Sequence, residues 1–247
     1  MRSRSSRFVL LVLVVVAATT SSRVESSQGE WDFAIAPYLW AAGMDGSIGI
    51  ANIEQDVDVG FSDIIDNLDL AFMGHFDMRN ERWVLVSDLV FVDLEHEEDL
   101  TQATVTAGLD LTLFEVAGGY RVSRVFTILA GARWVDMTAG VDYTGTLADE
   151  GADVSKDWID PLVGVHAFVP VSDKWWIGLL GDVGGFGVGS ELTWQAYVNV
   201  GFRLSHLVSI VLGYHAIDMD YEDGEGLASM SLDVTMSGPQ LGVVFSF

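Results

Sequence analysis

The chain of 247 residues contains no cysteine, only four prolines and only 12 lysines and arginines. The lack of cysteine excludes disulfides, thiolate metal sites, a cysteine nucleophile and a lipoprotein anchor. With 36 aspartates and glutamates the formal net charge is -24. A nucleic-acid partner is not expected, because binding to phosphates needs a basic face. Half of the residues are hydrophobic, which excludes a disordered chain.

Long hydrophobic runs are also missing, apart from one at the N-terminus. Arg2, Arg4 and Arg7 precede the apolar run Phe8–Ala18, and small polar residues follow up to Ser22. This order is typical of an export signal. An uncleaved membrane anchor is the alternative, but the run is shorter than the ~20 residues that a spanning helix needs. We predict a signal peptide over residues 1–22, a short lead over 23–30 and the folded domain over 31–247.

In place of spanning helices, the chain shows the two-residue alternation of β-strands. Every second residue from Trp194 to Leu204 is apolar, and the residues between them are polar or small. The segments 126–134 and 240–247 alternate in the same way. The alternation predicts an all-β fold in which one face of each strand is apolar.

The positions of the aromatic residues indicate which solvent the apolar face meets. Rings gather near the expected strand ends, as they do at both interfaces of a membrane barrel. They are Trp83, Tyr120, Phe126, Trp175 and Phe202 beside short turns, and Trp40, Trp134, Trp158 and Trp194 beside long loops. The strands are also long enough for a tilted crossing, which takes ~9–11 residues. We therefore expect a transmembrane antiparallel β-barrel in the outer membrane of a Gram-negative bacterium, with its lipid as a partner. A soluble periplasmic barrel that encloses a ligand is the alternative.

Short turns set the expected number of strands. Four short connections lie at 79–82, 121–124, 171–174 and 205–207, and with both termini at the same end they predict ten strands. The expected strands are 31–42, 68–79, 82–95, 104–121, 124–138, 157–170, 174–188, 191–205, 207–220 and 229–247. The long, acidic outer loops would then be 43–67, 96–103, 139–156 and 221–228.

Segment 43–67 allows two interpretations. An additional hairpin of Ile48–Ala51 with Asp56–Val59 would raise the number of strands to twelve. Alternatively the segment is an outer loop or luminal insert containing a short helix capped by Ser62. We favour the helix, because an even number of strands already closes the barrel without the hairpin.

Several strings resemble those of small outer-membrane β-barrel proteins of Gram-negative bacteria that have no established activity. They are FSDIIDNLDLAFMGHF (Phe61–Phe76), DWIDPLVG (Asp157–Gly164), GDVGGFGVGS followed by TWQA (Gly181–Ala196), LGYHAIDMDYEDG (Leu212–Gly224) and GPQLGVVFSF (Gly238–Phe247). The resemblance covers nearly all of the mature chain. It implies that the final Phe247 is the signal read by the outer-membrane assembly machinery. His215 departs from the family, where arginine is expected, so a luminal salt bridge at that position is in doubt.

The polar face of each strand would line the lumen. The expected luminal polar network comprises Asp88, Glu115, Arg133, Asp160, His166, Asp182, Arg203 and His215. Buried charges need partners, so Arg133 and Arg203 should each meet some of the carboxylates. Because a barrel of about eight strands is nearly filled by side chains, we expect a mostly filled polar lumen with a structural role. A narrow pore for small solutes is the alternative.

Enzymatic and metal sites have weaker support. A hydrolase at the rim or in the lumen, acting on lipid or peptide, would need a nucleophile beside a histidine, and no motif pairs a serine with His75, His96, His166 or His215. The acidic runs 149–157 and 218–225 could supply oxygen ligands to Ca²⁺ or Mg²⁺. The second run departs from the calcium-loop pattern, and we expect both runs to be solvated, mutually repelling loop surfaces. We expect no catalytic residues, no metal and no cofactor. The oligomeric state stays undetermined.

Overall fold

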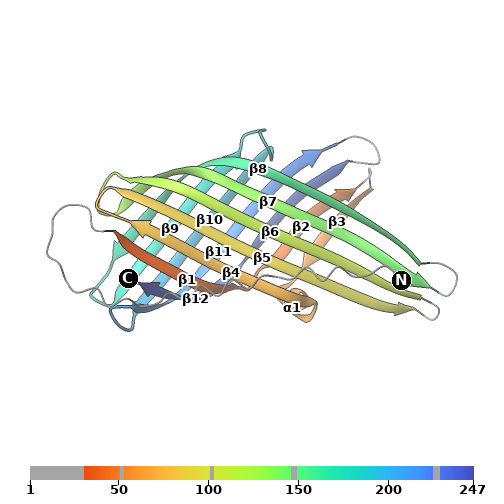
Figure 1. Ribbon diagram of the computed structural model, residues 1–247, viewed down its shortest axis with the longest axis horizontal. Coiled ribbons are helices and arrows are strands. Elements are labelled where there is room, and N and C mark those ends of the chain that lie inside the picture. The colour runs from red at the N-terminus through yellow and green to blue at the C-terminus, as the bar shows by residue number, and fades with distance from the viewer. Residues whose placement is uncertain (1–30, 51–52, 101–102, 146–148, 225–228) are drawn as a thin grey trace.

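The computed structural model describes residues 31–50, 53–100, 103–145, 149–224 and 229–247. The expected signal peptide and lead lie outside the described residues. Within them the chain forms twelve β-strands and one short α-helix (Figure 1). The strands are β1 (Asp32–Trp40), β2 (Gly43–Ile50), β3 (Ile53–Val59), β4 (Leu68–Arg79), β5 (Trp83–Leu100), β6 (Ala103–Arg121), β7 (Phe126–Gly145), β8 (Asp149–Pro170), β9 (Trp175–Gly185), β10 (Leu192–Arg203), β11 (Val208–Asp223) and β12 (Met230–Ser246), and the helix is α1 (Phe61–Asp66). No helix of the described part is long and apolar enough to cross a membrane.

Ten of the strands close into a barrel. From β4 to β12 each strand pairs antiparallel with the next, and β1 lies between β12 and β4. The four short turns join β4 to β5, β6 to β7, β8 to β9 and β10 to β11. The prediction of a ten-stranded antiparallel barrel is therefore confirmed. We call the end that carries these turns and Phe247 the turn end, and the opposite end the distal end.

The alternation in the sequence decides which side chains point outward. Val198, Leu212 and Ile159 face outward and are 52%, 60% and 57% exposed. Residues of the opposite parity on the same strands, such as Gln195 and His215, are buried in the lumen. A water-soluble barrel would place its apolar stripe inside, so the outward apolar stripe fits a lipid surround.

The hairpin of β2 and β3 is a correction to the expected structure of segment 43–67. β2 continues the direction of β1 and pairs with the distal half of β12, from Gly43↔Ser237 to Ile50↔Met230. β3 pairs back onto β2. The short helix is also present, but its N-cap is Gly60 and not Ser62. Hairpin and helix are thus both formed, because the hairpin adds to the sheet beyond the point where the barrel closes.

Strands β5 to β8 extend well past their expected distal ends. β5 reaches Leu100, β7 reaches Gly145, and β8 begins at Asp149. Most of the expected loops 96–103 and 139–156 is therefore strand, which is a second correction. Their ladders are continuous, as between Leu100↔Ala103 and Asp93↔Asp110. In Figure 1 these four strands end apart from β2, β3, β11 and β12 at the distal end.

Pro37 marks the point where the wall of the barrel opens. The β1–β4 ladder ends at Pro37↔Gly74, and a proline has no N–H to donate to a neighbouring strand. Beyond it, Leu68–Met73 of β4 pair only with β5 among the described residues. β3 likewise pairs only with β2 within the described part. Helix α1 connects these two unpaired flanks.

The aromatic residues agree with the expected girdle only in part. At the turn end Trp83 packs edge-on against Tyr120, and Trp175 lies against Phe202, all on the outer surface. At the distal end Trp40 and Trp158 were expected to face lipid, but both are buried in the lumen. This expectation was wrong because the parity of a strand residue decides its face, whatever its height along the barrel.

The distal half of the lumen is filled, and its side chains are apolar rather than polar as expected. A buried cluster occupies this half, and six of the eight methionines belong to it or pack against it. Its members from β11 and β12 are Ile217, Met219, Tyr221, Met230, Leu232, Val234 and Met236. Methionine adapts to irregular spaces, and here it fills the region where the two groups of distal strands face each other.

Candidate functional site

A buried arginine forms the centre of the lumen. Arg133 on β7 is 1% exposed, and its Nη2 lies 2.7 Å from Glu115 Oε2 and 2.8 Å from Asp182 Oδ1. Its Nε donates to the same Glu115 oxygen at 3.1 Å, and Nη1 donates to Thr193 Oγ1 at 3.0 Å. One guanidinium thus joins residues from β6, β7, β9 and β10.

The network continues across the lumen to β11. Gln195 Nε2 donates to Glu115 Oε2 at 2.7 Å, and Gln195 Oε1 lies 3.3 Å from His215 Nε2. The His215 ring stacks on Trp40, with centroids 4.2 Å apart. Arg133, Glu115, Asp182, Thr193, Gln195 and His215 form what we call the Arg133 cluster. Since all six are buried, the cluster forms a polar layer beneath the distal apolar cluster.

Asp160 has a separate role from the Arg133 cluster. Its carboxylate accepts hydrogen bonds from Ser190 N at 2.6 Å, from Ser190 Oγ at 2.7 Å and from Trp158 Nε1 at 3.2 Å. Ser190 lies in the turn between β9 and β10. Asp160 therefore anchors a short distal turn instead of pairing with an arginine.

A cavity of about 520 Å³ occupies the turn-end half of the lumen. His206 and Leu207, from the turn between β10 and β11, lie at its mouth together with Phe247. Its inner end is lined by Tyr38 and Tyr197. Tyr197 lies on β10, two residues after Gln195 of the Arg133 cluster. The cavity therefore opens at the turn end and ends below the Arg133 cluster.

A three-residue set lines the inner part of the cavity. Asp88 accepts a hydrogen bond from Tyr38 Oη at 2.7 Å with one oxygen, and its other oxygen lies 3.1 Å from His75 Nδ1. Both carboxylate oxygens of Asp88 are therefore engaged. The pairing of His75 with Asp88 resembles the base and orienting acid of a catalytic triad. However, no serine or threonine hydroxyl bonds to a histidine among the described residues, so the set lacks a nucleophile.

Arginines and aromatic rings surround the mouth of the cavity. The guanidinium of Arg79 lies 5.7 Å from the centroid of the Phe168 ring, and its Nε is 3.5 Å from Asp77 Oδ1. Phe168 packs against Trp176 with centroids 5.2 Å apart. Arg203 donates from Nη1 to the carbonyl oxygen of Asp173 at 2.9 Å.

The structure divides the eight residues of the expected luminal network among several places. Glu115, Arg133, Asp182 and His215 meet in one cluster, whereas Asp88 and Asp160 have other partners. The expected pairing of Arg203 with a luminal carboxylate is wrong, since none lies within salt-bridge distance in the described part. Arg203 is the last residue of β10, and its side chain turns to the rim. His166 lines the cavity without a hydrogen bond to any described residue.

Sequence reasoning missed several polar residues of these sites. Thr193 and Gln195 lie on the inward face of β10, and their alternation with Trp194 and Ala196 could have identified them. Ser190 could not be found in this way, because it lies in a turn. Within the described residues, no group of three or more histidines and carboxylates is arranged to hold a metal ion.

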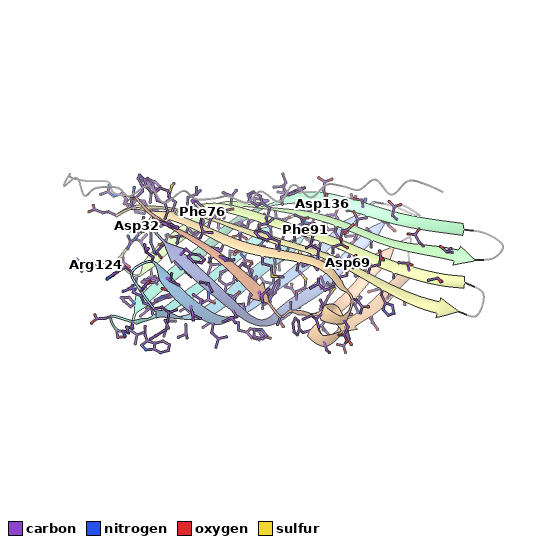
Figure 2. The ribbon with its side chains drawn as sticks, turned by 60° about the horizontal axis from the view of Figure 1, so that its bottom comes forward. Asp32, Asp69, Phe76, Phe91, Arg124 and Asp136 are labelled. Atoms are coloured by element: carbon purple, nitrogen blue, oxygen red, sulfur yellow. The ribbon has the colours of Figure 1, made fainter. Side chains whose placement is uncertain are left out.

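Charge is distributed unequally between the two ends. Six of the eight basic residues that the structure describes lie at the turn end, namely Arg79, Arg82, Arg121, Arg124, Lys174 and Arg203. Acidic residues such as Asp69 and Asp136 lie farther toward the distal end, as Figure 2 shows with Asp32 and Arg124 at the opposite end. The turn end is thus the less acidic of the two.

Comparisons with known proteins agree with the fold. No protein-family model matches the chain, and a search of curated proteins found no match. Among solved structures, the outer-membrane protease OmpT from Escherichia coli aligns with a TM-score of 0.54 and 6% identity, over 92% of this chain and 100% of that one. The translocator domain of the autotransporter NalP from Neisseria meningitidis aligns with a TM-score of 0.47 and 12% identity, over 89% and 90% of the two chains. The attachment invasion locus protein Ail of Yersinia pestis gives 0.39 and 10%, over 88% and 98%.

At these identities the likeness extends to the fold alone. The chain is an outer-membrane β-barrel of the Gram-negative type, with the apolar outward stripe that this location requires. In such barrels the short turns face the periplasm. The turn end, with its basic residues and its cavity, is therefore the periplasmic end.

Proposed function

We propose that the protein is a non-conducting outer-membrane barrel with a structural role, and not a solute pore. The Arg133 cluster carries this proposal. Its six side chains are bonded to one another across the lumen and are buried. Ions would have to displace a buried, hydrogen-bonded charge network in order to pass, which is costly.

The distal apolar cluster supports the same proposal. It lies between the Arg133 cluster and the outside, and Val135, Met230 and Val234 within it are at most 1% exposed. A hydrated ion would lose its water against these side chains without gaining any polar contact. Two consecutive barriers of opposite character therefore oppose a continuous aqueous path.

Single-channel recording in planar bilayers tests the proposal. The refolded protein should give no discrete conductance steps, even at a protein concentration that saturates insertion as measured by protease protection. Discrete steps would contradict the proposal. The variant Arg133→Gln then locates the path, because a change in the ratio of cation to anion permeability would place the current through the Arg133 cluster.

We also propose that the barrel is not a hydrolase. His75 and Asp88 lie in hydrogen-bonding distance, but no described hydroxyl bonds to His75, so a nucleophile for acyl transfer is missing. Incubation with fluorogenic ester, phospholipid and peptide substrates should give no turnover above that of empty vesicles. Turnover that disappears in His75→Gln would contradict this part of the proposal.

A further inference from the structure

We propose that the periplasm-facing cavity binds a small amphipathic anion, with an apolar body and a carboxylate-type head. The inference goes beyond the structural role and does not depend on it, because a cavity at one end can bind a ligand whether or not the barrel conducts. It rests on the size of the cavity, on its apolar wall and on hydrogen-bond donors in it whose N–H groups are free.

The cavity has the size and the wall of a small-molecule site. Its volume of about 520 Å³ falls within the range of about 300–1,000 Å³ that is usual for ligand pockets. Much of the wall is apolar and comes from four strands, namely Val86 on β5, Phe168 on β8, Trp176 and Leu180 on β9, and Val211 on β11. These side chains would enclose the apolar body of a ligand.

Trp176 is held against the wall by a local feature of β10. A side chain at Gly201 would place its Cβ 2.0 Å from Trp176 Cε2, so only glycine leaves room for the indole there. Gly201 pairs with Trp176 across the β9–β10 ladder. The Trp176 ring thus packs against the backbone of Gly201 and forms part of the cavity wall.

Several hydrogen-bond donors that face the cavity have free N–H groups. Arg203 uses Nη1 for the carbonyl oxygen of Asp173, and its other N–H groups bond to no described residue. The His166 ring has no hydrogen bond in the described part, and Arg79 meets Asp77 through Nε alone. A ligand that supplies acceptors would use these groups, and an anionic head would use them best.

Each of the three aspartates that line the cavity lies near a donor or a cation. Both oxygens of Asp88 have partners in Tyr38 and His75. Asp77 is buried, and its Oδ1 lies beside the Arg79 guanidinium. Asp32, the third aspartate of the lining, lies opposite Arg79 in the β1–β4 ladder. A cationic ligand would therefore compete with existing partners for these carboxylates, whereas the free N–H groups of Arg203 are open to an anion. This asymmetry favours an anion over an amine.

Three probes with the same apolar body test the nature of the head. Octanoate, octanol and octylamine are titrated calorimetrically into the protein held in phosphatidylcholine nanodiscs, and the heats from empty nanodiscs are subtracted. Octanoate should bind saturably and about tenfold more tightly than octanol, as expected for one additional charge-assisted hydrogen bond. Octylamine should bind more weakly than octanol. Equal affinities for the three probes, or no saturable binding, would overturn the proposal.

Substitutions at the mouth test the position of the head. Arg203 is exposed at the end of a strand, so Arg203→Gln should fold and should weaken octanoate binding about tenfold while leaving octanol binding unchanged. Arg203→Lys should retain most of the octanoate affinity. Arg124→Gln is the matched control, because Arg124 lies on the same rim but does not line the cavity. Equal effects of Arg203→Gln and Arg124→Gln would contradict the assignment of the head to Arg203.

A change of lipid distinguishes two sources of the anion. The head could belong to a free acid from the periplasm or to an anionic phospholipid of the inner leaflet, since the mouth lies at the rim. The octanoate titration is therefore repeated in nanodiscs that contain phosphatidylglycerol. Competition that weakens octanoate binding identifies a lipid as the source, and unchanged binding identifies a free acid. Both results retain the anion site.

Discussion

Trp158 stacks on Tyr221 inside the barrel, with ring centroids 3.9 Å apart and an angle of 14° between the planes. The two residues belong to β8 and β11, which are separated in the wall by β9 and β10. The hairpin of β9 and β10 ends early, at Gly185 and Leu192. Beyond this hairpin, β8 and β11 make contact through the two rings. These side chains close the distal lumen at the point where β9 and β10 are too short to form the wall.

The Arg133 cluster yields the first prediction. Arg133→Met removes the cation and leaves Glu115 and Asp182 buried without it, which should lower the free energy of unfolding by about 3–5 kcal/mol. The measurement is guanidinium-induced unfolding in lipid vesicles, followed by the gel shift between folded and unfolded barrel. Arg124→Gln, at the exposed rim, should leave the midpoint unchanged.

A second variant shows whether charge or volume is responsible. Adding Glu115→Gln to Arg133→Met removes one of the uncompensated carboxylates, so it should recover part of the loss. If the double variant is as unstable as the single one, the effect comes from packing and not from the buried charges.

The assignment of the two faces of β10 yields the second prediction. Val198 points to lipid, so Val198→Arg should destabilise the barrel by roughly 2–4 kcal/mol if the residue lies near the midplane. Asn199 points inward and accepts a hydrogen bond from Gln240, so Asn199→Ala should cost about 1 kcal/mol. The same unfolding assay compares them, and small, equal effects would refute the face assignment.

The turn between β9 and β10 yields the third prediction. A Cβ at Gly189 would lie 2.5 Å from Asp160 Oδ1 and 2.7 Å from the carbonyl oxygen of Ile159. Gly189→Ala should therefore push the turn away from Asp160 and destabilise the protein by about 1–3 kcal/mol. Gly118→Ala is the control, since nothing lies within 4 Å of its added Cβ. Protection of the Ser190 amide against hydrogen exchange should fall in the first variant only.

The C-terminal residue yields the fourth prediction. Phe247 exchanges backbone hydrogen bonds with Phe33, and the residue is 56% exposed. We propose that the assembly machinery reads its ring, as the resemblance implies. Phe247→Ala should slow insertion by reconstituted machinery several-fold, while spontaneous folding into vesicles stays within twofold of the unaltered chain. Equal slowing in both assays would attribute the effect to barrel stability instead of recognition.

The membrane-spanning part of each strand was predictable because its two faces meet different surroundings. Each strand there has lipid on one side and the lumen on the other, so alternation in β7 and β10 gives the face directly. The four turns followed from short polar connections between such strands. Beyond the membrane this contrast is lost, since both faces of β5 to β8 can meet water. Their distal residues therefore resembled loops, and residues 139–145 and 149–156 were not recognised as strand.

The candidate site was predictable only in its composition. Arg133 needed buried acids, and Glu115 and Asp182 were among those expected. Which acid it meets depends on the stagger of the strands around the barrel, and a single sequence does not contain that stagger. The same holds for the cavity, because the meeting of Trp176 with Gly201 is set by the register of β9 and β10.

The unpaired flank of β3 has a consequence for neighbouring copies of the protein. A bare strand edge is a template on which an identical edge can add, and such growth ends in aggregates. β3 carries Glu54, Asp56 and Asp58, all exposed, so two such edges would bring six carboxylates together. Like charges on facing strands repel, and the barrel can leave its sheet unfinished on this side while its copies stay apart.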